Sequence, residues 1–166
     1  MNLLNNTKPH SYEIQNGEFL LSTDPNKLDF DVIHKYLSYE SYWSFGIPRQ
    51  VVEAAAKGAT CFGIYHKGQQ IGYTRLISDG ATFGYLADVF ILEAYRGQGL
   101  GQWLISTVLA HPSYQGFRRW VLATRDAHDL YAKFGFTPLS RPDVYMEKIM
   151  FRTYPPTENQ QETQSV

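Results

Sequence analysis

The segment "YRGQGLGQWL" at residues 95–104 places three glycines within five residues, directly before an apolar run. Glycine destabilises regular structure, so such a cluster indicates a backbone shape that other residues cannot adopt. A glycine-rich turn that leads into a helix presents unpaired N–H groups and the positive end of the helix dipole. With Arg96 as a further donor, the segment predicts a phosphate or pyrophosphate site at residues 97–101.

The loop differs from the two most familiar nucleotide-binding loops. It lacks the Gly-Lys-Ser/Thr that ends a P-loop. It also lacks the G-x-G-x-x-G spacing of a dinucleotide-binding turn. A turn that needs glycine for its shape alone, and binds no phosphate, is the alternative at this point.

The flanking segments predict a mixed α/β (α+β) domain with a mostly antiparallel central sheet and helices on both faces. We expect one domain over residues 1–166, with a core at about 18–151 and a flexible tail at 153–166. The predicted strands are residues 18–23, 60–66, 69–77, 82–92, 118–124 and 144–151, and the predicted helices are residues 29–38, 48–57, 100–109 and 127–136.

The composition of the chain limits the kinds of partner that the protein is expected to bind. The chain has 166 residues, of which 43% are hydrophobic and 19% charged, as in ordinary globular proteins. A formal net charge of -1 argues against nucleic-acid or membrane partners. The opening residues resemble no secretory signal, and the single cysteine, Cys61, lies in an apolar strand, so we expect a cytoplasmic protein without disulfides. The histidines and carboxylates show no metal-ligand spacing, which predicts no metal.

Two motifs resemble those of the GNAT N-acetyltransferase superfamily. Residues Arg96, Gly97, Gln98, Gly99, Leu100 and Gly101 are similar to its R/Q-x-x-G-x-G/A signature, and "LYAKFGF" at residues 130–136 resembles its L-Y-x-x-x-G-F segment. The resemblance implies that these six residues bind the pyrophosphate of acetyl-CoA. It further implies direct transfer of the acetyl group to a primary amine within a ternary complex.

The resemblance also suggests roles for individual residues. The backbone of Val89, Phe90 and Ile91 would bind the pantetheine arm, and Tyr131 would protonate the departing thiolate. Thr124 occupies a position where the superfamily often has a cofactor-binding asparagine.

Other roles follow from the residues themselves. Asp88, on the predicted central strand, is either the general base or a structural carboxylate. Asp126 is expected to cap the following helix.

The aromatic run "YESYWSFGI" at residues 39–47 lies between the first two predicted helices. Tyr39, Trp43 and Phe45 are expected either to border the acceptor pocket or to pack in the core. The acceptor is a small-molecule or protein amine, and the chain is compatible with a homodimer. The alternatives to catalysis are a non-catalytic acyl-CoA sensor and an interaction module on the same scaffold.

Overall fold

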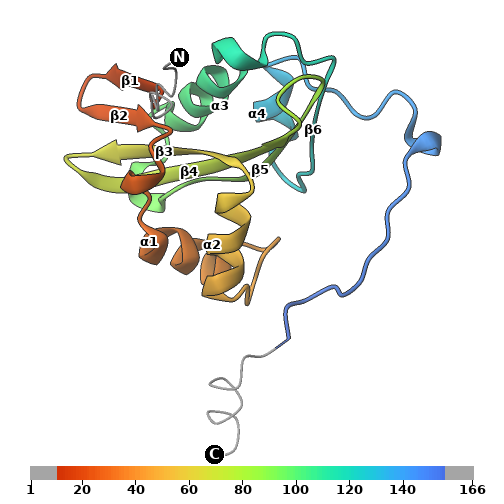
Figure 1. Cartoon of the computed structure of the whole chain (residues 1–166), viewed down its shortest axis with the longest axis horizontal. Coiled ribbons are helices and arrows are strands. Elements are labelled where there is room, and N and C mark those ends of the chain that lie inside the picture. Colours follow the sequence, from red (N-terminus) through yellow and green to blue (C-terminus); the bar gives the residue numbers. More distant parts are fainter. Residues whose placement is uncertain (1–10, 156–166) are drawn as a thin grey trace, which may run out of the picture.

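The computed structural model describes residues 11–155, which form one six-stranded sheet (Figure 1). The strand order follows the sequence, and every neighbouring pair is antiparallel except β5 and β6, which are parallel. The predicted mixed, mostly antiparallel sheet is therefore confirmed. The strands are β1 (Glu13–Asn16), β2 (Phe19–Ser22), β3 (Thr60–His66), β4 (Gln69–Ser78), β5 (Phe83–Ile91) and β6 (Arg119–Leu122).

Helices cover both faces of the sheet, as predicted. Figure 1 shows α1 (Phe30–Lys35) and α2 (Arg49–Lys57) on one face, and α3 (Leu100–Ala110) and α4 (His128–Ala132) on the other. The carboxylate of Asp29 accepts two backbone N–H groups of the first turn of α1 and thereby fixes where that helix begins. None of these helices is long and apolar enough to cross a membrane; the search covered the described part of the chain.

Each face of the sheet buries its own core. The first core lies under α3 and α4, and its buried members include Leu21, Phe62, Ile64, Ile71, Leu76, Leu86, Leu104, Ile105, Val108 and Tyr131. The second lies under α1 and α2, and it contains Ile33, Tyr36, Leu37, Ile47, Val52, Ala56, Cys61, Tyr73 and Phe90. The alternation of side chains along a strand explains how one sheet supplies both cores.

The N-terminal third contains two elements that the sequence did not predict. β1 is a short, largely exposed strand that pairs with β2 across a turn at Gly17, where φ is 58°. The predicted helix at residues 29–38 is also divided, because α1 ends at Lys35 and a π-helical segment, Tyr36–Glu40, follows.

The predicted last strand is wrong. Residues 144–151 form no strand, and their side chains are exposed, with Met146 98% accessible. A strand requires a neighbour that accepts its backbone hydrogen bonds, and within residues 11–155 this segment has none. The predicted flexible tail falls mostly on residues 156–166, which lie outside the described residues. Before them, Tyr154 is partly buried against the second core.

Candidate active site

The glycine loop forms the entrance of α3. Gly97 and Gly99 have φ angles of 76° and 78°, a left-handed conformation that side chains strongly disfavour. Open space surrounds the position where either residue would carry a Cβ atom. The first hydrogen bond within α3 runs from the Trp103 N–H to the Gly99 carbonyl, so the N–H groups before Trp103 lack helical partners. The loop therefore presents unpaired donors and a helix dipole to an accessible surface, which suits an anion.

Arg96 is an exposed residue whose side chain is held by two hydrogen bonds within the protein. Its Nε donates to the Ile91 carbonyl at 3.0 Å, and its Nη2 donates to the Tyr36 hydroxyl at 3.0 Å. Arg96 thereby ties the loop to the end of β5 and to the π-helical segment. Two of the five guanidinium N–H groups thus fix the loop, and the remaining ones, with the backbone N–H groups, are left for an anion.

β5 and β6 separate halfway along β5. Their parallel pairing covers only residues 83–86 of β5 and residues 119–122 of β6. Beyond Leu86, β5 continues to Ile91 with β4 as its only strand neighbour among the described residues. One edge of residues 87–91 is consequently open for backbone hydrogen bonds to an extended ligand.

The residues predicted to bind the pantetheine arm lie on this open edge. Phe90 points into the second core, whereas Val89 and Ile91 pack against the first. Phe90 and Ile91 are buried, whereas Val89 is half-buried and also lines a cavity beside β5, so the backbone is the main group left for binding. Both readings of the sequence, core strand and backbone ligand, are compatible with this geometry.

A β-bulge in β5 lies at Asp88, just beyond the end of its pairing with β6. Tyr73 lies opposite Phe90 and Arg75 opposite Ala87, so β5 contains one residue more than β4 over this stretch. Asp88 has a φ of 56°, one of two positive values at non-glycine residues in the described range. The extra residue reverses the alternation of faces, which is why Leu86 and Ile91 face the same core.

Both carboxylate oxygens of Asp88 have donors. The Nε of Arg75 donates to Oδ2 at 2.5 Å, and the indole Nε1 of Trp43 donates to Oδ1 at 3.1 Å. The Asp88 side chain is only 9% exposed. This arrangement locks Arg75 and Trp43 against the bulge.

Trp43, Arg75 and Asp88 line a cavity of about 310 Å³ between the bulge of β5 and the loop before α4. Thr124, Asp126 and Tyr131 line the same cavity from the opposite side. The structure thus brings together the predicted proton donor, the predicted base and one of the three predicted aromatic residues.

Tyr131 projects from α4 and is 8% exposed. Its side chain lines this cavity and also a second one, of about 370 Å³, that runs over α4 and β6. Burial raises the pKa of its phenol to about 12, and nearby Tyr42 and Asp126 act in the same direction. The hydroxyl therefore stays protonated over the whole physiological pH range.

The aromatic run divides between the cavity and the surface. Tyr39 stacks edge-on against His34, Phe45 is 64% exposed, and neither side chain lines the cavity. Tyr42 does line it and accepts the Arg125 backbone N–H at 2.9 Å. The spacing of aromatic residues alone could not select Tyr42 over its neighbours, because the chain after Glu40 is irregular.

The turn before α4 differs from its prediction. The N-cap position is Ala127, without a side-chain cap, and Asp126 instead faces the cavity, 3.4 Å from the Tyr42 hydroxyl. The Thr124 hydroxyl accepts the Ala127 N–H at 3.1 Å, so Thr124 stabilises the turn. It also lines both cavities.

Cys61 lies outside the cavity. Its thiol is buried in the second core, 3.1 Å from the Tyr73 hydroxyl, and burial raises its pKa. A protonated, enclosed thiol is a poor nucleophile, which agrees with a packing role. Among residues 11–155, histidine, cysteine and acidic side chains form no group of three that could hold a metal ion.

Comparison with known proteins agrees with this geometry. The sequence profile of a family described as "Acetyltransferase (GNAT) domain" matches residues 57–138. A GNAT-family protein of Xanthomonas campestris, provisionally named an acetyltransferase, has a crystal structure that superimposes with a TM-score of 0.78. It is 45% identical over 80% of this chain and 93% of that one. The chain belongs to the GNAT family of acetyltransferases.

Two further relatives extend the comparison. A provisionally named acetyltransferase of Gibberella zeae is 35% identical over 122 residues, 62% of this chain and 68% of that protein. A GNAT acetyltransferase of Elizabethkingia anophelis, solved with acetyl-CoA bound, is 16% identical, with a TM-score of 0.56 over 82% of this chain and 90% of that one. The second likeness concerns the fold alone. Family membership supports acetyl transfer as the class of activity.

Proposed function

We propose that this GNAT chain is an acetyl-CoA-dependent N-acetyltransferase that transfers the acetyl group to a primary amine within a ternary complex. The observation behind the proposal is the succession of features along β5. The cavity lies beside its bulge, the open edge follows at residues 87–91, and the glycine loop comes next. A ligand with a pyrophosphate at one end and a thioester at the other matches this succession.

The chain's own groups suit each part of acetyl-CoA. The unpaired N–H groups at residues 97–101 would bind the pyrophosphate, because its charge lies at the positive end of α3. The open edge of β5 would pair with the amide groups of the pantetheine arm. Acetyl-CoA itself supplies the activated acyl group, and the protein positions it beside Tyr131.

Tyr131 is the proposed proton donor to the leaving sulfur. The amine nitrogen bonds to the thioester carbonyl carbon, the C–S bond breaks, and the phenol gives its proton to the thiolate. The phenol pKa of about 12 exceeds that of an ordinary thiol in water, about 8.5. The same burial destabilises a thiolate beside Tyr131 and so raises the proton affinity of the sulfur as well.

The acceptor's proton requires a second group. We propose that Asp126, exposed at the cavity and held only by a 3.4 Å contact with Tyr42, receives it directly or through water. Asp88 enters this proposal as the carboxylate that holds Arg75 and Trp43 in place, because each of its oxygens accepts a hydrogen bond from one of them. Of the two roles that the sequence left open for Asp88, general base or structural carboxylate, this proposal takes the second, and it is tested below.

The cavity favours a small acceptor or an extended side chain that presents one amine. Trp43 and Tyr42 offer aromatic surfaces, and Asp126 offers a negative charge to an ammonium group. We propose no nucleic-acid or membrane partner, and we place the reaction in the cytoplasm.

A thiol-release assay tests the proposal. Purified protein is incubated with acetyl-CoA and a panel of primary amines, and free CoA is titrated with a thiol reagent. The single cysteine is buried, so the protein adds little background. Release of CoA that depends on one amine, with the acetylated amine found by mass spectrometry, supports the transferase.

The outcome also separates the alternatives. Stabilisation by acetyl-CoA without turnover on any amine would favour an acyl-CoA sensor on this scaffold. Absence of both stabilisation and turnover would favour an interaction module.

A further inference from the structure

Arg75 is a cation on an inner strand of the sheet, beside the proposed acceptor cavity. β4 pairs with β3 on one side and with β5 on the other, and Arg75 lies opposite Cys61 and Ala87. Its side chain is 20% exposed and lines the cavity of about 310 Å³ that Tyr131 also lines. Burial of a guanidinium group is costly unless its N–H groups meet hydrogen-bond acceptors. An arginine at this position therefore needs acceptors.

The protein supplies an acceptor for only one part of this group. The Nε of Arg75 donates to Asp88, whereas the two terminal nitrogens, with four N–H groups, have no hydrogen-bond partner among residues 11–155. Neither nitrogen is enclosed, because the Tyr65 hydroxyl is the single buried side-chain polar atom without a partner in this part of the chain. The terminal nitrogens therefore reach the open space of the cavity. They offer the planar pair of donors with which arginine binds an anionic group.

The formal charges around the cavity are balanced. Its charged lining residues are Arg75, Asp88 and Asp126, and the guanidinium of Arg125 stacks on the ring of Tyr42 at the cavity wall, 3.8 Å from the ring centroid. A simple amine would enter as a cation and leave an excess positive charge, whereas an amine that carries a phosphate would leave an excess negative charge. A zwitterion with one ammonium and one carboxylate group keeps the balance.

We propose that the acceptor is an amino acid whose carboxylate binds the terminal nitrogens of Arg75 while its amine lies between Asp126 and Tyr131. The inference rests on the proposed acetyl transfer and narrows its acceptor from any primary amine to one that carries a carboxylate. Asp126 and Arg75 line the same cavity, so a single small molecule can contact both. Binding of the carboxylate at Arg75 then fixes which end of the molecule faces the thioester.

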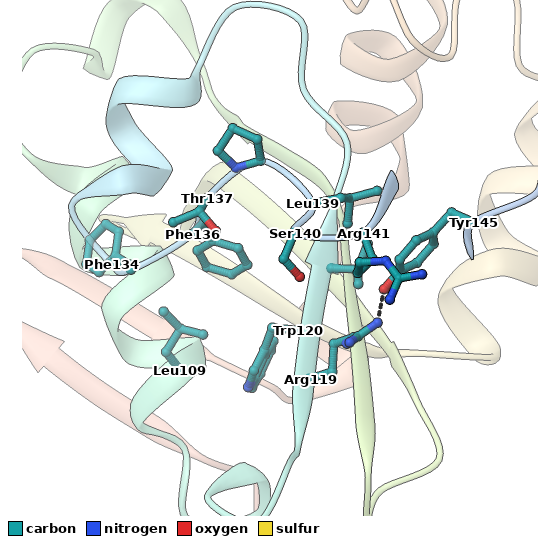
Figure 2. A pocket seen from close by; sticks show the side chains of 13 residues that line it. Leu109, Arg119, Trp120, Phe134, Phe136, Thr137, Leu139, Ser140, Arg141 and Tyr145 are labelled. Carbon is teal, nitrogen blue, oxygen red and sulfur yellow. Dashed lines mark hydrogen bonds between the residues drawn. The ribbon is translucent and has the colours of Figure 1, made fainter. Parts of the chain in front are cut away.

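A second cavity with arginines provides a contrast. It has a volume of about 320 Å³ and lies over β6, where Arg119 and Arg141 line it together with apolar side chains (Figure 2). Arg119 already donates to the Tyr145 hydroxyl, and among the described residues that line this cavity none is acidic and none is Tyr131. Arg119 is therefore a matched control, an arginine beside a cavity but away from the proposed transfer.

The first test compares paired substrates in the thiol-release assay. A panel of α-amino acids without thiol groups, and ω-amino acids of increasing chain length, are each assayed beside the amine that lacks only the carboxylate. For at least one pair, kcat/KM should be about ten- to a hundredfold higher for the amino acid, the range expected of a hydrogen bond between charged groups. Release of CoA that is equal or faster with every plain amine would support the transferase and overturn this inference.

Variants show whether Arg75 is responsible for the preference. Arg75→Gln alone would leave the buried carboxylate of Asp88 without its cation, so the double variant Arg75→Gln/Asp88→Asn removes both charges together. In this variant the kcat/KM ratio between the preferred amino acid and its amine should fall by the same ten- to a hundredfold. The intrinsic reactivities of the two amines cancel, because the ratio is compared between variants.

Two single variants complete this test. Asp88→Asn should keep the ratio, because it lowers turnover on both substrates and retains the cation of Arg75, and Arg119→Gln should keep it as well. An unchanged ratio in the double variant, or an equal loss of the ratio in Asp88→Asn, would overturn the inference.

Binding without turnover separates this inference from the proposed function. Saturation-transfer NMR detects contact between the protein and the same amino acids, with CoA in place of acetyl-CoA. If no amine is acetylated but an amino acid binds to the wild type and not to the double variant, the transferase proposal fails and the carboxylate site at Arg75 stands. If no amino acid is acetylated and none binds, the carboxylate site fails too. A stronger preference for 2-aminoethyl phosphate than for β-alanine would overturn the carboxylate in favour of a phosphate.

Discussion

Replacing Gly99 with valine tests the loop most directly, because the structure provides a control with the same backbone cost. Gly99 has a φ of 78°, and open space surrounds its Cβ position. The variant therefore meets no clash, only the strain of a left-handed residue, about 1–2 kcal/mol or somewhat more for a β-branched side chain. Gly68, in the hairpin between β3 and β4, has a φ of 81° and equally open space. Gly68→Val should therefore lower the free energy of unfolding by the same amount as Gly99→Val.

The two variants should differ only in their response to acetyl-CoA. At a hundred times its Kd, a ligand stabilises the folded state by about 2.7 kcal/mol, which raises Tm by roughly 5–11 °C for a chain of this size. If Gly99→Val weakens binding a hundredfold, the same concentration contributes only about 0.4 kcal/mol, roughly 1 °C. Gly68→Val should keep the full increment from its lowered starting Tm.

Differential scanning fluorimetry with and without acetyl-CoA measures both quantities. Equal increments in wild type, Gly99→Val and Gly68→Val would refute the assignment of the pyrophosphate to this loop. Equal loss of the increment in both variants would indicate general destabilisation, and would refute it as well.

Three further predictions concern the cavity and its phenol. Tyr131→Phe should lower turnover by about ten- to a thousandfold while acetyl-CoA stabilisation is kept, and wild-type turnover with chemistry rate-limiting would exclude the proton donor. Asp126→Asn should lose more turnover at low pH than at high pH, because at high pH more of the amine arrives already deprotonated. Asp88→Asn should lower turnover about a hundredfold at every pH, because it disturbs positioning. If instead Asp88→Asn shows the pH-dependent loss and Asp126→Asn the uniform one, Asp88 is the base. The pKa of Tyr131 is about 12 in the folded protein and about 10 in the unfolded chain, so the unfolded phenol ionises first as the pH rises. The contribution of Tyr131 to the free energy of unfolding should therefore fall by about 1.3 kcal/mol between pH 9 and pH 11. Urea unfolding of Tyr131→Phe should show a correspondingly smaller fall, and an identical fall would contradict the shift.

The glycine loop was predictable because local chemistry determines it. Left-handed backbone at Gly97 and Gly99 requires glycine, and an apolar helix must follow where the chain turns back onto the sheet. Both requirements are visible in ten consecutive residues. The same locality explains why the π-helical break after Lys35 was missed, since no proline or glycine marks it.

The arrangement at Asp88 could not be read from the sequence. A bulge depends on how β5 meets β4, and the residues that stabilise it, Arg75 and Trp43, are 13 and 45 positions away. An aspartate in the left-handed region is compatible with many turns, so its residue type gives only a weak signal. The role of Asp126 was likewise hidden, because the pattern D-x-x-D resembles a cap whether or not the helix begins there.

The failed prediction at residues 144–151 has a different cause. Hydrophobicity and strand propensity are properties of the segment itself, whereas pairing is a property of two segments and cannot be deduced from the composition of one. Both halves of the pair are nevertheless present: an apolar segment without a sheet, and a β6 edge without a neighbour. Within residues 11–155 the two stay apart, because the segment leaves the domain between the contact of Tyr145 with Arg119 and the packing of Tyr154 on the second core, and its composition carries no signal of that path (Figure 1).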